Sequence, residues 1–168
     1  MSRALITGAS RGIGAAIARA LAAQGHTVIL NYRTQEEQAE AVRSDIEARG
    51  GKAVLARFDV RDREASAAAL EALLRDPEPI DILVNNAGIA RDNPLPSISW
   101  EDWDTVTRTT LDGFYNVTKP MVMPMVRRKY GRIINIASVS GVTGNRGQTN
   151  YAAAKAGLIG ATKSLAKE

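Results

Sequence analysis

The sequence lacks cysteine altogether and has a single histidine, His26, among its 168 residues. The absence of cysteine excludes disulfide bonds and thiolate-ligated metal sites. One histidine argues against a His-rich metal site and against a Ser-His-Asp triad. Because His26 lies between an expected helix and an expected strand, we assign it a structural role. The sequence therefore predicts no metal site.

An excess of charge of one sign and a long apolar run are missing as well. The 22 basic and 18 acidic residues leave a net charge of +4, and the basic residues are scattered except for Arg127-Arg128-Lys129. This triplet lies near an expected helix C-terminus, where cations favour the helix dipole, so we expect no nucleic-acid partner. The chain enters a strand almost at once and has no apolar stretch suited to secretion or membrane spanning. A cytoplasmic protein without a membrane partner is the default expectation.

The composition, 45% hydrophobic and 24% charged, is that of an ordinary globular protein, and 168 residues indicate one domain over 1–168. Apolar runs alternate with amphipathic stretches, which predicts βαβ units and an α/β fold with a doubly wound parallel sheet. We expect strands near 3–7, 27–31, 53–58, 81–84 and 132–137, and helices near 13–24, 35–49, 62–75, 100–118 and 150–167. An interior helix proline costs about 3 kcal/mol, so Pro120 and Pro124 predict a separate helical piece over 121–128, bent away from the preceding helix.

A glycine-rich stretch, Thr7-Gly8-Ala9-Ser10-Arg11-Gly12-Ile13-Gly14, follows the apolar strand Ala4-Leu5-Ile6 and opens a helix. Its glycine spacing differs from the usual G-x-G-x-x-G fingerprint but meets the same needs, a tight turn and close approach of backbone, phosphate and helix. The helix N-terminus offers free N–H groups and a positive dipole end to a pyrophosphate. The pattern alone is compatible with an ordinary turn, but its position between strand and helix favours dinucleotide binding.

A second candidate site lies on the helix that opens at Asn150-Tyr151. Tyr151 and Lys155 are four residues apart and so share one helix face. An adjacent ammonium stabilises a phenolate, which lets a tyrosine act as general acid or base. A tyrosine of this kind can protonate the carbonyl group of a substrate. Ser138 lies at the end of the apolar run Ile133-Ile134-Asn135-Ile136, and its hydroxyl can polarise that carbonyl group. A lone Tyr-x-x-x-Lys pair is common on solvated helix faces, so this evidence gains weight only with the glycine-rich stretch.

Together with Asn85-Asn86-Ala87-Gly88, these segments resemble the short-chain dehydrogenase/reductase family, over essentially the whole chain from Arg3 to Glu168. The likeness is greatest to its 3-oxoacyl-(acyl carrier protein) reductases, because Gly144-Asn145-Arg146-Gly147-Gln148 and the stretch from Tyr151 to Gly160 read much like that branch. The resemblance implies a Rossmann-type fold and hydride transfer from NADPH to the 3-oxo group of an acyl thioester on acyl carrier protein, as in fatty acid biosynthesis. It also implies a homo-oligomer, a dimer or a tetramer.

The resemblance assigns roles to individual residues. Tyr151 would protonate the nascent alkoxide, Ser138 would hydrogen-bond the carbonyl oxygen, and Lys155 would bind the nicotinamide ribose and assist Tyr151. The Asp59-Val60 pair would contact the adenine ring. The residues assigned to the cofactor are Gly8, Ser10, Arg11, Gly12, Ile13, Gly14, Arg33, Asp59, Val60, Asn86, Ala87, Gly88, Tyr151 and Lys155.

The choice between NAD and NADP depends on the end of the second strand. NAD preference usually needs an acidic residue there, but the strand ends Asn31-Tyr32-Arg33 and the next carboxylate is Glu36. Arg33 can pair with a 2′-phosphate, and Arg11 can approach the same group, since guanidinium and phosphate form charge-assisted hydrogen bonds. Alternatively, both arginines are solvated surface residues. The pattern favours NADP(H).

Two features depart from the family pattern. Thr110, in Thr109-Thr110-Leu111-Asp112-Gly113-Phe114, stands where the family has an asparagine that holds a water of the proton relay. A hydroxyl also binds water, so we expect altered efficiency rather than loss of activity. The second departure is the end at Glu168, because family members continue with further strands, a turn beside the nicotinamide and a substrate-covering loop.

The sequence therefore suggests a fragment, or a short form completed by a partner. The last strand would then be an exposed apolar edge, and the chain prone to self-association. Two other hypotheses about the function stay open. In the first, the chain is a non-catalytic dinucleotide-binding or regulatory protein. In the second, it is a structural subunit that packs through the small-residue face Ala153, Gly157, Gly160 and Ala161.

Overall fold

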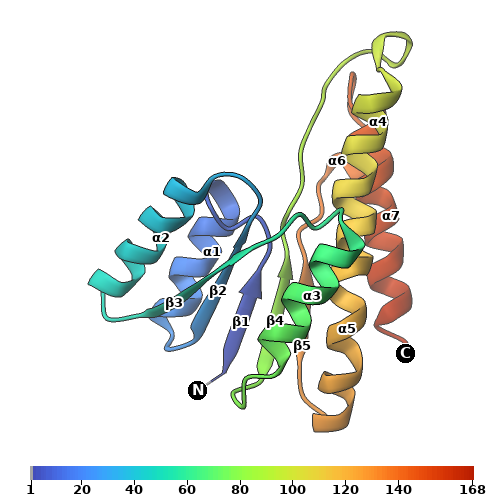
Figure 1. The fold of residues 1–168 in the computed structure, drawn as a ribbon. Helices are drawn as coiled ribbons and strands as arrows, with labels where there is room; N and C mark the ends of the chain where they lie inside the picture. The colour runs from blue at the N-terminus through green and yellow to red at the C-terminus, as the bar shows by residue number, and fades with distance from the viewer. Residues whose placement is uncertain (1) are drawn as a thin grey trace.

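The sheet is parallel throughout and reverses its direction of winding at its first strand. The computed structural model describes residues 2–168. The sheet contains β1 (Arg3–Ile6), β2 (Thr27–Tyr32), β3 (Lys52–Arg57), β4 (Ile80–Asn85) and β5 (Arg132–Asn135), in the order β3-β2-β1-β4-β5 (Figure 1). Because β1 lies between β2 and β4, the chain winds outward in both directions from it. This arrangement confirms the expected doubly wound α/β fold.

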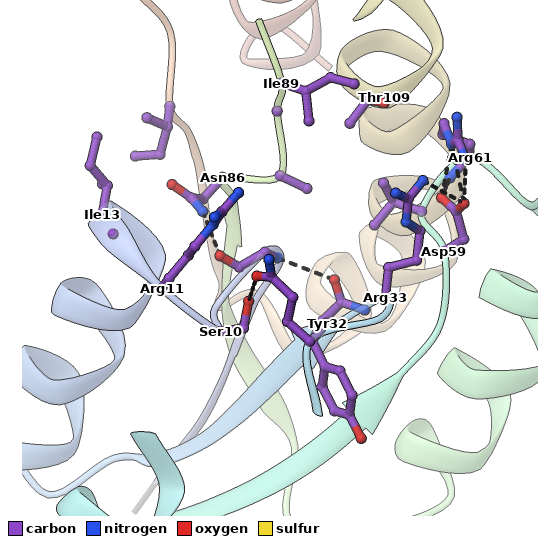
Figure 2. Close-up of a pocket in the computed structure, with 18 of the residues that line it drawn as sticks. Ser10, Arg11, Ile13, Tyr32, Arg33, Asp59, Arg61, Asn86, Ile89 and Thr109 are labelled. Atoms are coloured by element: carbon purple, nitrogen blue, oxygen red, sulfur yellow. Dashed lines mark hydrogen bonds and ion pairs between the residues drawn. The ribbon is translucent and has the colours of Figure 1, made fainter. Parts of the chain in front are cut away.

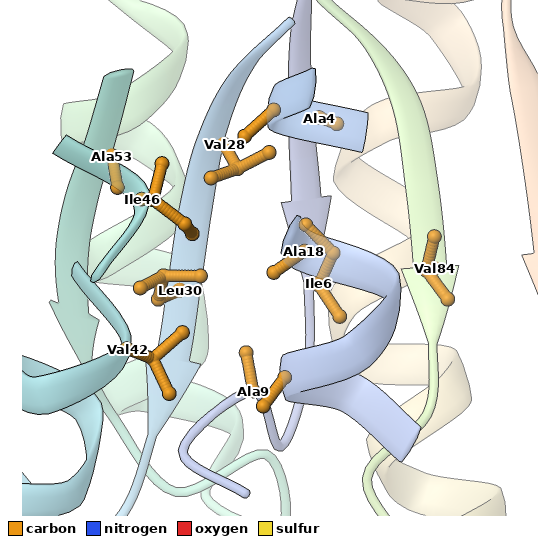
Figure 3. Close-up of a cluster of buried hydrophobic side chains, with 12 residues drawn as sticks. Ala4, Ile6, Ala9, Ala18, Val28, Leu30, Val42, Ile46, Ala53 and Val84 are labelled. Carbon is orange, nitrogen blue, oxygen red and sulfur yellow. The ribbon is translucent and has the colours of Figure 1, made fainter. Parts of the chain in front are cut away.

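Helices cover both faces of the sheet. Along β1, Ala4 and Ile6 belong to a core cluster formed with α1 (Gly12–Ala23) and α2 (Glu36–Ala48) (Figure 3). Leu5 belongs to the cluster on the other face, formed with α3 (Arg63–Leu74) and α5 (Gly113–Arg128). Successive side chains of a strand point to opposite faces, so an almost continuous apolar strand is needed to fill both clusters.

The remaining elements follow β4 and β5 in the chain. They are a 3₁₀ turn (Leu95–Ser97), α4 (Trp100–Thr107), a π-helical turn (Arg108–Asp112), α6 (Ser140–Thr143) and α7 (Thr149–Leu165). Figure 1 shows α7 alongside α4 and α5. On the expected small-residue face of α7, a Cβ added at Gly157 would lie 3.1 Å from Leu111 Cδ2, whereas one added at Gly160 would meet nothing within 4 Å. Gly157 therefore serves packing within this chain.

The expectation of a helix broken at its prolines is wrong. The α5 helix runs through both Pro120 and Pro124, and the irregular turn lies before it, at Arg108–Asp112. Met121 and Met125 are one turn apart on α5 and are 0% and 6% exposed. Their burial against the sheet holds the segment in helical conformation and offsets the hydrogen bonds that the prolines cannot donate.

The helix ends follow local sequence signals. Gly25 and Gly50 end α1 and α2 with φ angles of +88° and +80°, a conformation that glycine adopts without strain. Asp62 caps α3 by accepting hydrogen bonds from the backbone N–H groups of Glu64 and Ala65 at 3.0 and 2.9 Å. No helix within residues 2–168 has the length and hydropathy to cross a membrane.

Candidate active site

A cleft of about 450 Å³ opens at the carboxyl ends of the strands (Figure 2). In a doubly wound sheet this edge is where ligands bind, at the point where the strand order reverses. Its lining includes most of the residues that the sequence assigned to a cofactor: Gly8, Ser10, Arg11, Gly12, Ile13, Arg33, Asp59, Val60, Asn86, Ala87, Gly88, Tyr151 and Lys155. One cleft thus joins the glycine-rich turn to the Tyr151–Lys155 pair.

Gly12 and Gly14 serve different purposes in the glycine-rich turn. Gly12 has a φ of +56° and open space around its Cα, so its conformation is what requires glycine. Gly14 does not line the cleft. A Cβ added there would collide with the Gly8 carbonyl oxygen and lie 2.6 Å from Asn86 Nδ2. Gly14 therefore permits close packing of α1 against the glycine-rich turn. Gly12 leaves the N-terminus of α1 uncovered by a side chain.

Asn86 and Thr7 fix the shape of this turn. Asn86 Nδ2 donates to the carbonyl oxygens of Thr7 and Gly8 at 2.9 and 3.1 Å. Thr7 Oγ1 accepts from the backbone N–H groups of Asn86 and Ala87, both at 3.0 Å. The Asn86 side chain therefore holds the turn after β1 against the end of β4.

Asn31, which the sequence analysis did not assign to the site, supports the turn from the other side. Its Oδ1 accepts from Gly8 N at 3.2 Å, and its Nδ2 donates to the carbonyl oxygens of Ala56 and Phe58 at 3.2 and 3.0 Å. Asn31 is 2% exposed. A polar residue within an otherwise apolar strand was the available signal, since a buried amide must find partners.

The end of the cleft beside the ends of β2 and β3 carries a group of charged side chains. Arg33 Nη1 lies 3.6 Å from Asp59 Oδ2, and Arg61 Nη2 lies 2.8 Å from the same oxygen. Burial alone would raise the pKa of Asp59, but hydrogen bonds from Arg61 and the charges of Arg61 and Arg33 hold it below its usual value. Glu36, the first carboxylate after β2, instead pairs with Arg57 at 3.3 Å. No acidic residue from the end of β2 therefore faces this part of the cleft.

Arg11 and Arg33 have different surroundings. Figure 2 shows Arg11 extending from the start of α1 and Arg33 turned toward Asp59 on the opposite side of the opening. The Arg33 side chain is 54% exposed. The two arginines frame the opening rather than form a cluster.

At the other end of the cleft, Lys155 is almost completely buried, at 3% exposure. Its Nζ donates to the Ile136 carbonyl oxygen at 2.6 Å and lies 5.6 Å from the centroid of the Tyr151 ring. Burial lowers the pKa of Lys155. Asn150 sets the start of α7, since its Oδ1 accepts from Tyr151 N at 2.8 Å and its Nδ2 donates to Arg91 O at 3.1 Å. The structure thus brings Tyr151 and Lys155 to one end of the cleft.

Ser138 lies after β5 and does not line the cleft, which Ile136 and Ala137 line instead. Its Oγ accepts from Ser140 N at 3.2 Å. The short helix α6 ties this segment to α7, because a Cβ added at Gly141 would lie 2.8 Å from Ala156 N. The catalytic role of Ser138 stays a prediction.

Thr110 is 3% exposed, and within residues 2–168 its Oγ1 has no hydrogen-bond partner. Its neighbour Thr109 lines the cleft and donates to Thr105 O at 2.6 Å. Both threonines lie in the π-helical turn Arg108–Asp112, and of the two only Thr109 is among the residues that line the cleft. The role of Thr110 also stays a prediction.

Comparison with known proteins places this geometry in a family. Residues 2–168 match the family described as short chain dehydrogenase, and the chain belongs to that family of oxidoreductases. It is 52% identical over 165 residues to the 3-oxoacyl-[acyl-carrier-protein] reductase FabG of Aggregatibacter actinomycetemcomitans, covering 98% of this chain and 68% of the relative. The corresponding reductase of Synechocystis is 48% identical, covering 98% and 67%. The chain spans about two thirds of the length of these curated relatives.

A solved structure gives the same result for the fold. The gluconate 5-dehydrogenase of Burkholderia cenocepacia, crystallised with NADP and tartrate, superimposes with a TM-score of 0.91 at 39% identity. The match covers 98% of this chain and 64% of that one. The resemblance to short-chain dehydrogenases, and to their 3-oxoacyl reductase branch, is confirmed.

Proposed function

We propose that this chain carries the cofactor site and catalytic residues of an NADPH-dependent reductase that converts a 3-oxoacyl thioester to its 3-hydroxy form. The observation that carries the proposal is the single cleft that joins an open helix N-terminus to Tyr151 and Lys155. The relatives named as 3-oxoacyl-[acyl-carrier-protein] reductases support the substrate class. We also propose that the substrate is carried on acyl carrier protein, and that the protein is a cytoplasmic homo-oligomer, a dimer or a tetramer.

The residues present fit a dinucleotide. The first turn of α1 has no side-chain cap and no acidic residue, so its N–H groups and positive dipole end are available to a pyrophosphate. Arg33 stands at the end of β2, where a 2′-phosphate would lie, with its side chain half exposed. An arginine in this position favours NADP(H) over NAD(H).

The chemistry at the other end needs a proton donor beside a ketone. The cofactor supplies a hydride to the carbonyl carbon when bound. Tyr151 donates its phenolic proton to the carbonyl oxygen, so that one carbon–hydrogen and one oxygen–hydrogen bond replace the C=O π bond. On the family resemblance, Ser138, which follows the cleft-lining residues Ile136 and Ala137, would donate a hydrogen bond to the same oxygen.

Lys155 places a cation beside the phenol of Tyr151. The only bond that the structure gives its Nζ within residues 2–168 is to the Ile136 carbonyl oxygen, so further donor capacity is free for a ribose hydroxyl. Gly88 leaves room there, since a Cβ added at Gly88 would lie 3.5 Å from Lys155 Nζ. A larger residue at this position would crowd the same space.

The test uses the protein expressed from its complete reading frame, an acetoacetyl thioester and NADPH. We expect NADPH consumption to match formation of the 3-hydroxy thioester one for one, measured by absorbance and mass spectrometry. Thr110 stands where the family has an asparagine, and this difference supports a second candidate function, that of a non-catalytic dinucleotide-binding protein. Tight NADPH binding without any turnover would favour that alternative and contradict the proposal.

A further inference from the structure

At the end of the cleft beside β2 and β3, the carboxylate of Asp59 is shared unequally between two arginines. Arg61 Nη2 and Nε donate to Asp59 Oδ2 at 2.8 and 3.1 Å, and Arg61 N donates to Asp59 Oδ1 at 2.9 Å. Arg33 lies within ion-pair distance of Asp59, at 3.6 Å, without a hydrogen bond to it. Figure 2 shows both guanidinium groups directed at this one side chain.

The backbone at Arg61 and at Asp59 is anchored by further hydrogen bonds, and both side chains are largely shielded from solvent. The Arg61 carbonyl oxygen accepts from Arg108 Nη2 at 3.4 Å, and the Asp59 carbonyl oxygen accepts from Ser66 Oγ at 3.2 Å. The Arg61 and Asp59 side chains are 28% and 25% exposed, against 54% for Arg33. Arg61 is therefore the fixed partner of Asp59, and Arg33 is the arginine that is able to turn to another anion.

The local charge depends on Arg61. With it, the three side chains Arg33, Arg61 and Asp59 together carry a net charge of +1. Without it, Asp59 and Arg33 would sum to zero, and Asp59 would be free to hydrogen-bond Arg33 directly. A phosphate would then have to compete with a carboxylate for the same guanidinium.

We propose that Arg61 is a positioning residue for cofactor choice: it occupies Asp59 and so leaves Arg33 free to bind a 2′-phosphate. The inference rests on the proposed NADP(H) function and adds a residue to it. Arg61 does not need to touch the cofactor. It acts through Asp59, and its effect is confined to ligands that carry the 2′-phosphate.

The test compares two adenosine ligands that differ only in that group. Adenosine 2′,5′-bisphosphate and adenosine 5′-monophosphate are titrated calorimetrically into the unmutated protein and its variants. We expect Arg61→Ala to lower the preference for the bisphosphate by at least about fivefold, which equals about 1 kcal/mol. Arg61→Lys should restore part of the preference, because it keeps the charge. Arg63→Ala is the matched control, since Arg63 is an exposed arginine two residues further on, at the start of α3, that does not line the cleft, and it should leave the preference unchanged.

A second variant separates positioning from direct contact. In the Arg61→Ala protein, Asp59→Asn removes the competing negative charge, so the preference for the bisphosphate should return. If the preference does not return, Arg61 itself contacts the phosphate and the inference is overturned. An equal loss of both ligands in Arg61→Ala would show a merely structural role and would also overturn it. If the unmutated protein showed no preference at all, the proposed NADP(H) function would fail first.

Discussion

Replacing Gly14 with alanine should damage both the stability of the domain and its cofactor site. The new methyl group would collide with the Gly8 carbonyl oxygen and lie 2.6 Å from Asn86 Nδ2. Neither neighbour can retreat freely, because Asn86 Nδ2 is held by Thr7 O and Gly8 O at 2.9 and 3.1 Å. Overpacking of this kind costs about 1–3 kcal/mol. Each lost hydrogen bond adds about 0.5–1.5 kcal/mol.

Alanine also has an advantage over glycine inside a helix, of about 0.8–1.0 kcal/mol. The net expectation for Gly14→Ala is therefore a fall of about 1–3 kcal/mol in the free energy of unfolding, with weaker NADPH binding. Gly160→Ala is the control, since its Cβ would meet nothing within 4 Å, and it should raise stability by about 0.5–1 kcal/mol. Urea denaturation followed by circular dichroism measures both variants. A Gly14→Ala protein as stable as the unmutated one would refute the packing argument.

The other predictions concern single side chains of the cleft and its surroundings. NADPH should bind at least about tenfold more tightly than NADH, a difference of about 1.4 kcal/mol, and Arg33→Ala should remove most of that gap; equal dissociation constants in the unmutated protein would contradict this. Thr110→Val should raise the free energy of unfolding by about 1 kcal/mol, because it removes a buried hydroxyl that has no partner within residues 2–168; a fall would show that the hydroxyl is hydrogen-bonded. Because burial lowers the pKa of Lys155, the unfolded chain binds more protons between that pKa and the ordinary lysine value of about 10.4. Stability should therefore rise with pH through this window, and urea titrations across it should show a flatter profile for Lys155→Met.

The architecture could be predicted from the sequence because each helix and strand is marked by signals within its own segment. Strands are short apolar runs, and Gly25 and Gly50 stop helices through their own backbone conformation. The glycine-rich turn and the Tyr151–Lys155 spacing were recognisable for the same reason. Their meeting in one cleft follows from the parallel sheet, whose carboxyl ends share an edge.

The features that could not be predicted from the sequence depend on contacts between segments that are distant in the chain. Pro120 and Pro124 were expected to break a helix, but burial of Met121 and Met125 keeps it intact. The π-helical turn at Arg108–Asp112, from which Thr109 lines the cleft, was not expected from the sequence. Arg61 was two residues from an assigned aspartate, yet spacing alone does not show whether an arginine binds that carboxylate or points into solvent.

Tyr151 is proposed as the proton donor at one end of the cleft, and a comparison of two tyrosine variants tests that role. The chain contains a second pair of the same spacing, Tyr115 and Lys119, with the Tyr115 hydroxyl 2.8 Å from Lys119 Nζ and its ring half exposed on α5. The measurement is the rate of NADPH-dependent reduction of an acetoacetyl thioester by Tyr151→Phe and Tyr115→Phe proteins, with NADPH affinity determined for each. We expect Tyr151→Phe to abolish reduction while NADPH still binds, and Tyr115→Phe to keep the full rate. A Tyr151→Phe protein with more than about a tenth of the unmutated rate, a barrier change under about 1.4 kcal/mol, would contradict it.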